Sequence, residues 1–140
     1  MVAGKDYIGV GCGALIIGAD RKVLLVRRRR PPEADTWSIP GGKVSFGETI
    51  QNAVIREVQE ELGILIDVIA LLGVTDHILP EENSHWVAPA FLARIKSGNP
   101  MNLEPAAHHE FAWFDPNNLP KETSLTTNCA VSFYNNYLKR

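Results

Sequence analysis

The pattern of apolar and polar positions divides this chain into six strands and two helices. Apolar runs that alternate with polar residues and end at glycine, proline or other turn residues predict strands, because successive strand side chains point to opposite faces. Residues 18–21 are expected to form a hairpin turn between the first two strands. The predicted strands are residues 7–17, 23–29, 37–39, 64–79 with a break near Gly73, 86–95 and 110–114.

Apolar residues recur at helical spacing in two other segments. The first helix is expected from Glu48 to Gly63, where glycine adopts the left-handed conformation that ends many helices. The second is expected over residues 126–138, with basic residues favourably placed at its C-terminal end. A helix between strands and a second helix at the end indicate a mixed sheet between helices, and this pattern leaves α/β and α+β equally open.

The size and charge of the chain narrow the function classes. Its 140 residues, 45% of them apolar, suffice for one sizeable core, so we expect a single domain over residues 1–140. The formal charge of -2 gives no electrostatic reason to expect a nucleic-acid polymer as partner. We find no signal-peptide pattern and no apolar run near the roughly 18 residues of a membrane span. We therefore expect a cytoplasmic protein without membrane contact.

The cysteines and histidines show no metal-ligand spacing. Cys12 alternates with glycines in an apolar strand, so we expect a buried free thiol there. The glycines at positions 9, 11 and 13 leave one side of this strand open to another backbone or to a ligand.

Candidate chemistry lies within the first predicted helix, where three carboxylates follow a basic residue. Glu57, Glu60 and Glu61 are spaced i, i+3 and i+4, so they project from one side of the helix. At about 4 Å, carboxylates in partly desolvated surroundings repel one another by several kcal/mol. A divalent cation removes that cost, and hard oxygen ligands favour Mg²⁺ or Mn²⁺ over zinc. The alternative is an acidic helix face that is simply exposed to solvent.

The turn before this helix also suits a ligand site, because glycines at positions 41 and 42 let the backbone approach a ligand closely. The spacing of turn and helix is G-x5-E-x7-R-E-U-x-E-E-x-G-U, where U is a bulky aliphatic residue. All defined positions are filled, by Gly42, Glu48, Arg56, Glu57, Val58, Glu60, Glu61, Gly63 and Ile64. On this motif the chain resembles the Nudix hydrolases. The resemblance extends more loosely to the glycine-rich first strand and to residues 37–42 and 110–120.

This resemblance implies a fold and a reaction. The implied fold is the Nudix α/β/α sandwich with a mixed β-sheet, of class α/β or α+β. The implied reaction is metal-dependent hydrolysis of a nucleoside diphosphate linked to another group, with Mg²⁺ or Mn²⁺ as the cofactor.

The resemblance also implies roles for the residues of the motif. Glu57 and Glu61 would be the principal metal ligands, with Glu60 next to them and the carbonyl of Gly42 completing the coordination shell. Arg56 would hold one of the motif's carboxylates in place rather than touch substrate.

The general base is less defined, because related enzymes take it either from the motif or from a distant loop. The distant candidate is Glu110, which lies three residues before Trp113. Glu104 is the competing candidate for the general base. The alternative for Glu110 is that it is a solvent-exposed glutamate at the end of a strand with no role in the site.

Three residues are candidates for contact with the substrate. Arg28 belongs to the basic run 27–30, which follows an apolar strand and faces either solvent or phosphate groups. Trp37 and Trp86 could stack on a nucleobase, a contact worth roughly 1–3 kcal/mol in nucleic-acid complexes. Packing in the core is the alternative for both tryptophans.

The substrate is expected to be a small-molecule nucleotide. The short chain resembles MutT-like enzymes that convert a nucleoside triphosphate to the monophosphate and pyrophosphate. ADP-ribose and GDP-mannose are the alternative substrates, and a non-catalytic nucleotide-binding module is a further alternative. The sequence leaves open whether the protein forms a homodimer.

Overall fold

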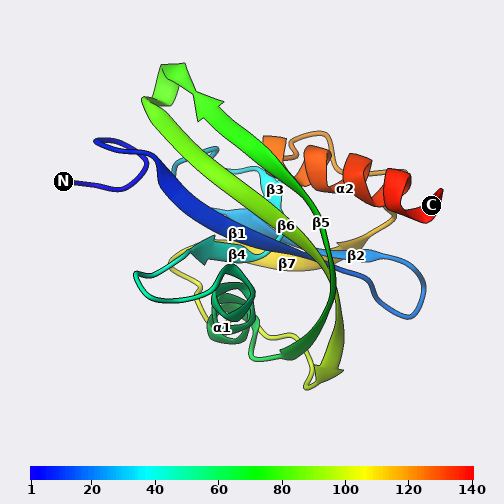
Figure 1. Ribbon diagram of the computed structural model, residues 1–140. Helices are drawn as coiled ribbons and strands as arrows, with labels where there is room; N and C mark the ends of the chain where they lie inside the picture. The colour runs from blue at the N-terminus through cyan, green and yellow to red at the C-terminus, as the bar shows by residue number, and fades with distance from the viewer.

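The computed structural model describes residues 1–140 and contains seven strands in two sheets, two α-helices and one short 3-10 helix (Figure 1). The sheets cross near the middle of the molecule, and the N- and C-termini lie on opposite sides of the view in Figure 1. In chain order the elements are β1 (Gly9–Ile16), β2 (Val23–Arg28), β3 (Trp37–Ser38), β4 (Gly41–Lys43), α1 (Ile50–Leu62), β5 (Leu65–Leu79), η1 (Pro80–Glu82), β6 (Ser84–Ser97), β7 (His108–Phe114) and α2 (Leu125–Leu138).

The larger sheet is mixed, as the sequence pattern predicts. Its strand order is β4-β1-β6-β5, with β1 parallel to β6 and the other neighbours antiparallel. The second sheet, β3-β2-β7, is antiparallel throughout. The apolar pattern did not predict that the strands divide into two sheets. It also did not predict the short strand β4, because β4 consists of two glycines and a lysine.

Two apolar cores lie on opposite faces of the strands. Neighbouring residues of β1 belong to different cores, because Ile16 lies in the core under α1 and Leu15 lies in the core under α2. Leu24 and Leu25 of β2 divide in the same way, as the strand period of two requires. The two helices therefore cover opposite sides of the strands (Figure 1), and the expected α/β/α arrangement is confirmed.

The ends of both helices follow from their capping residues. α1 begins at Ile50 rather than at Glu48, because the side chain of Thr49 accepts a hydrogen bond from the Asn52 N–H at 3.1 Å and caps the helix. Gly63 ends it with a φ of 69°, as expected from the sequence. Ser124 caps α2 through the Thr127 N–H.

β5 is continuous across Gly73, where the sequence indicates a break. The pairing with β6 is irregular at several points between Leu65 and Gly73 and regular from Gly73 to Leu79, so these irregularities do not end the strand. Gly73 is required by packing, because a Cβ there would collide with the ring of Phe133 on α2.

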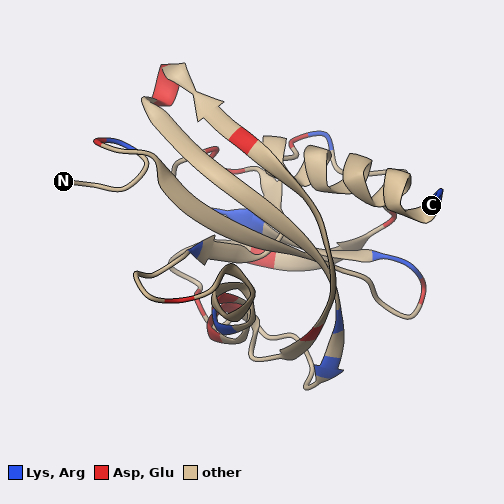
Figure 2. Cartoon of the chain, in the orientation of Figure 1, with Lys and Arg blue, Asp and Glu red and all other residues tan.

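The surface carries charges of both signs. Acidic positions occur on α1 and in the surrounding loops, and basic positions occur at the end of β6 and beside the acidic residues of α1 (Figure 2). No helix is long and apolar enough to cross a membrane. Cys12 is buried and both cysteines are free thiols, which agrees with the expectation for Cys12.

Candidate active site

α1 places the three glutamates of the motif in different environments. Glu61 is 3% exposed and faces the protein interior. The side chain of Glu57 is 18% exposed, whereas that of Glu60 is 51% exposed. Glu57 and Glu61 therefore lie inside the site, and Glu60 lies at its margin.

Arg56 joins three segments of the motif. Its guanidinium donates to both oxygens of Glu48, at 2.7 and 2.9 Å, in a bidentate pair. It also donates to Glu57 Oε1 at 2.9 Å and to Glu60. A further hydrogen bond reaches the carbonyl of Lys43 on β4 at 3.2 Å. Arg56 thus fixes α1, β4 and the intervening loop around Glu57.

Opposing effects set the ionisation of the carboxylates near Arg56. The hydrogen bonds from Arg56, helped by the Ser45 N–H, lower the pKa of Glu48 to about 2. Burial raises the pKa of Glu57 above its ordinary value, although Arg56 acts in the opposite direction. Glu57 is therefore the costlier carboxylate to keep charged, as expected for a group that awaits a cation.

The Pro40–Gly42 turn packs directly against these carboxylates. The Gly41 N–H donates to Glu61 Oε1 at 2.9 Å. A Cβ on Gly42 would collide with the carboxylate of Glu57, so the motif needs glycine at this position. The carbonyl of Gly42 accepts a hydrogen bond from the Cys12 thiol at 3.3 Å. Burial raises the pKa of Cys12 to about 11, so the thiol keeps its proton.

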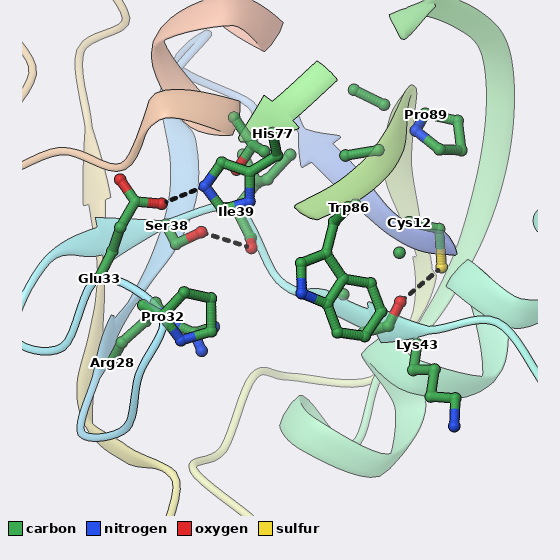
Figure 3. Close-up of a pocket in the computed structure, with 17 residues that line it drawn as sticks. Cys12, Arg28, Pro32, Glu33, Ser38, Ile39, Lys43, His77, Trp86 and Pro89 are labelled. Carbon is green, nitrogen blue, oxygen red and sulfur yellow. Dashed lines mark hydrogen bonds and ion pairs between the residues drawn. The ribbon is translucent and has the colours of Figure 1, made fainter. Parts of the chain in front are cut away.

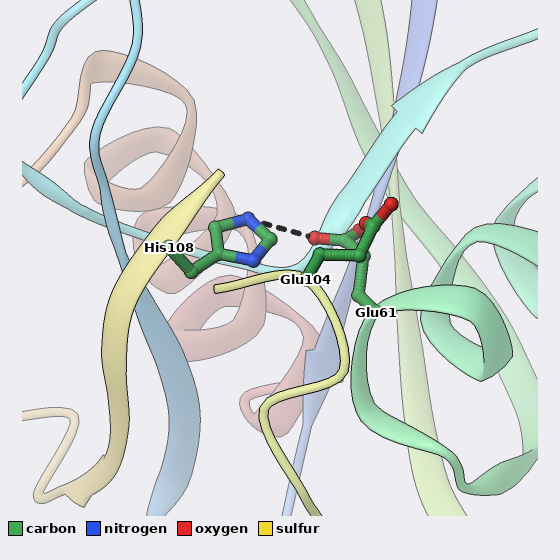
Figure 4. A group of neighbouring side chains, drawn as sticks. All are labelled: Glu61, Glu104 and His108. Atoms are coloured by element: carbon green, nitrogen blue, oxygen red, sulfur yellow. Dashed lines mark ion pairs between the residues drawn. The ribbon is translucent and has the colours of Figure 1, made fainter. Parts of the chain in front are cut away.

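A histidine and a third glutamate meet Glu61 from outside the motif. His108 Nε2 lies 3.0 Å from Glu61 Oε2, and both side chains are buried (Figure 4). Glu104 lies beside them, and one ligand atom from each of the three residues falls within 4.8 Å of the others. The buried Nδ1 of His108 has no hydrogen-bond partner.

Backbone hydrogen bonds bring the loop with Glu104 to the end of α1. The N–H groups of Met101 and Leu103 donate to the carbonyls of Leu62 and Glu61, which the helix leaves unpaired. A turn then brings the His108 N–H to the carbonyl of Glu104 at 3.0 Å. The loop is therefore anchored to the helix turn that carries Glu61.

These donors fit a divalent cation. Glu57, Glu61 and Glu104 are the carboxylates that could hold such a cation. Their charges interact, because the charge of Glu104 acts to raise the pKa of Glu57 and the charge of Glu57 acts to raise that of Glu61. Burial raises the pKa of Glu61, whereas the hydrogen bonds from His108 and the Gly41 N–H act in the opposite direction. Carboxylates suit Mg²⁺ and Mn²⁺, and the imidazole of His108 is compatible with Mn²⁺.

Glu110 does not join this group. Its side chain is exposed on β7, whereas Glu104 lies beside Glu61. Phe111 packs against the core under α1, so its neighbour Glu110 points to the other face of β7 by strand alternation. β7 also contains an extra residue, because Val26 pairs with Phe111 but Arg28 pairs with His108. This bulge turns His108 toward α1. The carboxylate that the fold brings to the site is the competitor, Glu104.

A pocket of about 240 Å³ begins at the Gly41–Lys43 strand. Arg28 and Trp86 line it, at the positions expected of substrate contacts (Figure 3). Arg28 donates to the carbonyl of Pro32 at 2.7 Å. Burial lowers the pKa of Arg28, and the charges of Glu61 and Glu33 oppose that shift. The guanidinium thus lies within electrostatic reach of the carboxylate cluster.

Trp37, by contrast, packs in the core. Its ring meets Phe114 edge to face, with centroids 4.8 Å apart, and contacts the apolar cluster under α2. It is not among the residues that line the pocket. The geometry therefore gives Trp37 a packing role, and the predicted stacking on a nucleobase is not supported. The glycine side of β1 receives the indole of Trp86, which lies over Gly9.

Comparison with known proteins identifies the family. The NUDIX domain family model matches residues 8–132. The chain belongs to the Nudix family. Its glutamate-rich motif on α1, with Gly42 and Arg56, is thus the Nudix box.

Relatives within the Nudix family carry different names. An ADP-ribose pyrophosphatase of Methanocaldococcus jannaschii is 38% identical over 106 residues, which are 76% of this chain and 62% of that protein. A Mycobacterium tuberculosis protein, provisionally named 8-oxo-dGTP diphosphatase 2, is 46% identical over 107 residues, which are 74% of this chain and 70% of that protein. The chain thus spans less than two thirds of the archaeal relative.

A solved structure agrees with the fold. The crystal structure of a MutT Nudix hydrolase from Burkholderia pseudomallei matches with a TM-score of 0.86 and 42% sequence identity. The match covers 91% of this chain and 98% of that one. The expected Nudix fold is therefore confirmed.

Two residues of the candidate site were missed in the sequence. His108 has no regular spacing to the box, and only the bulge in β7 directs it to Glu61. Glu33 lines the pocket from the loop after β2 and pairs with His77 of β5. Neither His108 nor Glu33 has a spacing to the box that would single it out in the sequence.

Proposed function

We propose that this chain is a metal-dependent pyrophosphohydrolase that cleaves a nucleoside diphosphate linked to another group. The proposed substrate is a nucleoside triphosphate, and the products are the monophosphate and pyrophosphate. One observation carries the proposal: Glu57 and Glu61 lie beside the Gly41–Gly42 turn, where the pocket begins. The anionic part of a nucleotide would meet the carboxylates there, while the nucleoside would occupy the pocket.

The chain's own residues divide the work in this proposal. Glu57 and Glu61 would hold the divalent cation, with Glu60 and the Gly42 carbonyl at the edge of its shell. Arg56 positions Glu57 through its hydrogen bond, and His108 positions Glu61. A bound Mg²⁺ or Mn²⁺ would supply charge neutralisation at the phosphates and a water of lowered pKa.

Glu104 is proposed as the general base or as a third carboxylate of the metal site. It lies next to Glu61 and is itself exposed, so it can reach a water molecule in the mouth of the site. The charge of Glu104 also contributes to the raised pKa of Glu57. Glu110 remains the alternative that the sequence suggested.

Paired variants separate these two carboxylates. We expect Glu104→Gln to lower kcat with little change in KM, because the lost interaction strengthens mainly in the transition state. Glu110→Gln, a matched change of an exposed glutamate six residues away, should keep close to full activity. Steady-state kinetics with saturating Mg²⁺ tests both. A larger loss of kcat in Glu110→Gln than in Glu104→Gln would indicate that Glu110, on β7, is the general base.

The substrate is tested with a panel of nucleotides in the presence of Mg²⁺. We expect a nucleoside triphosphate to give the monophosphate and pyrophosphate, identified by chromatography and a pyrophosphate assay. Release of diphosphate and orthophosphate would place the cleavage at a different bond. ADP-ribose belongs in the panel because a 38% identical relative is named for that substrate. Preference for ADP-ribose or GDP-mannose would replace the triphosphate in the proposal.

A further inference from the structure

One side of the pocket is chemically unlike the other. Lys43 and Cys12 lie at the side next to the Nudix box, and Glu33 and His77 lie at the opposite side, with Trp86 between them (Figure 3). A nucleotide with its phosphates at the box would extend its base toward Glu33. Trp86 offers an aromatic surface along that path.

The Glu33 carboxylate is fixed by two elements. His77 Nε2 lies 2.7 Å from Glu33 Oε1, and the Leu125 N–H at the start of α2 donates to Oε2 at 2.9 Å. Burial acts to raise the pKa of Glu33, but these hydrogen bonds outweigh it and hold the pKa below its ordinary value. Glu33 is therefore a charged acceptor at neutral pH, and its position is set by β5 and α2.

The same contacts could exist only to attach the loop after β2 to the rest of the fold. Two observations go beyond that role. Glu33 and His77 both line the pocket, and the Glu33 side chain remains 17% exposed. An ionised carboxylate has about four lone-pair positions, and the protein occupies only two of them here. Acceptor capacity is thus left on a charged group beside the cavity.

An acceptor-only group discriminates strongly among nucleobases. It accepts hydrogen bonds from an exocyclic amino group, and it repels the carbonyl oxygen that replaces this group in a deaminated base. Sites built to bind a particular N–H reject an analogue that lacks it, because a buried polar group is then left unpaired.

We propose that Glu33, held in place by His77, is a specificity residue that accepts a hydrogen bond from the exocyclic amino group of the substrate's base. The substrate class is then nucleotides of amino-bearing bases, in preference to counterparts that lack this amino group. This inference rests on the proposed function, because it places the phosphates at the Nudix box.

Matched pairs of substrates test the proposal with the unmodified protein. GTP differs from ITP by one amino group, and CTP carries an amino group where UTP has a carbonyl. A hydrogen bond to a charged group predicts that kcat/KM favours GTP over ITP and CTP over UTP by roughly tenfold to a hundredfold. Equal or better use of ITP and UTP would overturn the proposal while leaving pyrophosphohydrolysis intact.

Variants identify the group responsible. Glu33→Gln keeps the volume of the side chain, and its oxygen can still accept from the Leu125 N–H, but the charge is lost. The ratios of kcat/KM for GTP over ITP and for CTP over UTP should therefore fall toward one. Asp35→Asn is the matched control: Asp35 lies in the same loop and pairs with His109 at 3.0 Å, outside the pocket. An equal loss of preference in the control, or an unchanged preference in a folded Glu33→Gln, would contradict the role of Glu33.

Binding measurements keep this inference separate from catalysis. If no nucleotide is hydrolysed, the proposed function fails, but calorimetry of GMP against IMP and of CMP against UMP still measures base preference. We expect tighter binding of GMP and CMP. Equal affinities within both pairs would overturn the inference independently of turnover.

Discussion

Replacement of Glu57 by glutamine is expected to lower kcat by at least about a hundredfold, because even residues that only orient a metal ligand contribute tenfold to a hundredfold. Glutamine keeps the volume beside Gly42 and removes the charge that a divalent cation requires. The fold should survive, since burial already disfavours the charged form of Glu57 and a neutral side chain avoids that cost. Steady-state kinetics and a thermal melt of the same preparation measure the two effects.

The control for this change is Asp67→Asn, which removes an exposed carboxylate of β5 that faces Arg94 at 3.5 Å. It should alter neither kcat nor the melting temperature appreciably. If Glu57→Gln melts far below the unmodified protein and loses activity only through unfolding, Glu57 is structural. Mn²⁺ binding followed by electron paramagnetic resonance should weaken in Glu57→Gln and not in Asp67→Asn.

Arg56→Lys is expected to have the second large effect, a fall in kcat of about tenfold to a hundredfold. Lysine keeps the positive charge but cannot make the bidentate contact to Glu48 while also reaching Glu57 and Lys43. Glu57 would then lose the hydrogen bond that orients it. The melting temperature should also fall, because α1, β4 and the loop between them share this guanidinium.

Arg94→Lys serves as the matched control for Arg56→Lys. Arg94 makes a single exposed contact to Asp67, and its side chain is 67% exposed. Exposed pairs of this kind contribute at most about 1 kcal/mol, so we expect little change in activity or melting temperature. Equal activity of Arg56→Lys and the unmodified protein would show that charge alone, rather than the geometry of the guanidinium, supports the site.

Much of the site could be predicted from the sequence because the Nudix box is local. A helix of known period fixes the relative positions of Glu57, Glu60 and Glu61 without knowledge of the rest of the fold. Gly42 is close in sequence to the helix, so its turn could be placed beside the helix from the spacing alone. What the spacing could not predict is the degree of burial, which separates the buried Glu61 from the exposed Glu60.

The parts of the site that the sequence left open or missed depend on contacts between distant segments. Glu110 was named over Glu104 from its place before Trp113, where related enzymes often carry an acidic residue. Glu104 lies beside Glu61 because backbone hydrogen bonds anchor its loop to the end of α1. Trp37 was a candidate for stacking on a nucleobase, with core packing as the alternative. The sequence could not decide between the two, because its partner Phe114 lies 77 positions later and no local pattern pairs them. The Glu33–His77 pair likewise joins a loop to β5 across 44 positions.

Dependence of turnover on a divalent cation tests the central claim most directly. A nucleoside triphosphate that is hydrolysed in Mg²⁺ should be stable when the protein is first treated with a chelator, and addition of excess Mg²⁺ or Mn²⁺ should restore release of monophosphate and pyrophosphate. Glu57→Gln should recover little activity under the same restoration. Full turnover in the presence of the chelator would contradict the assignment of the carboxylate cluster as a metal site.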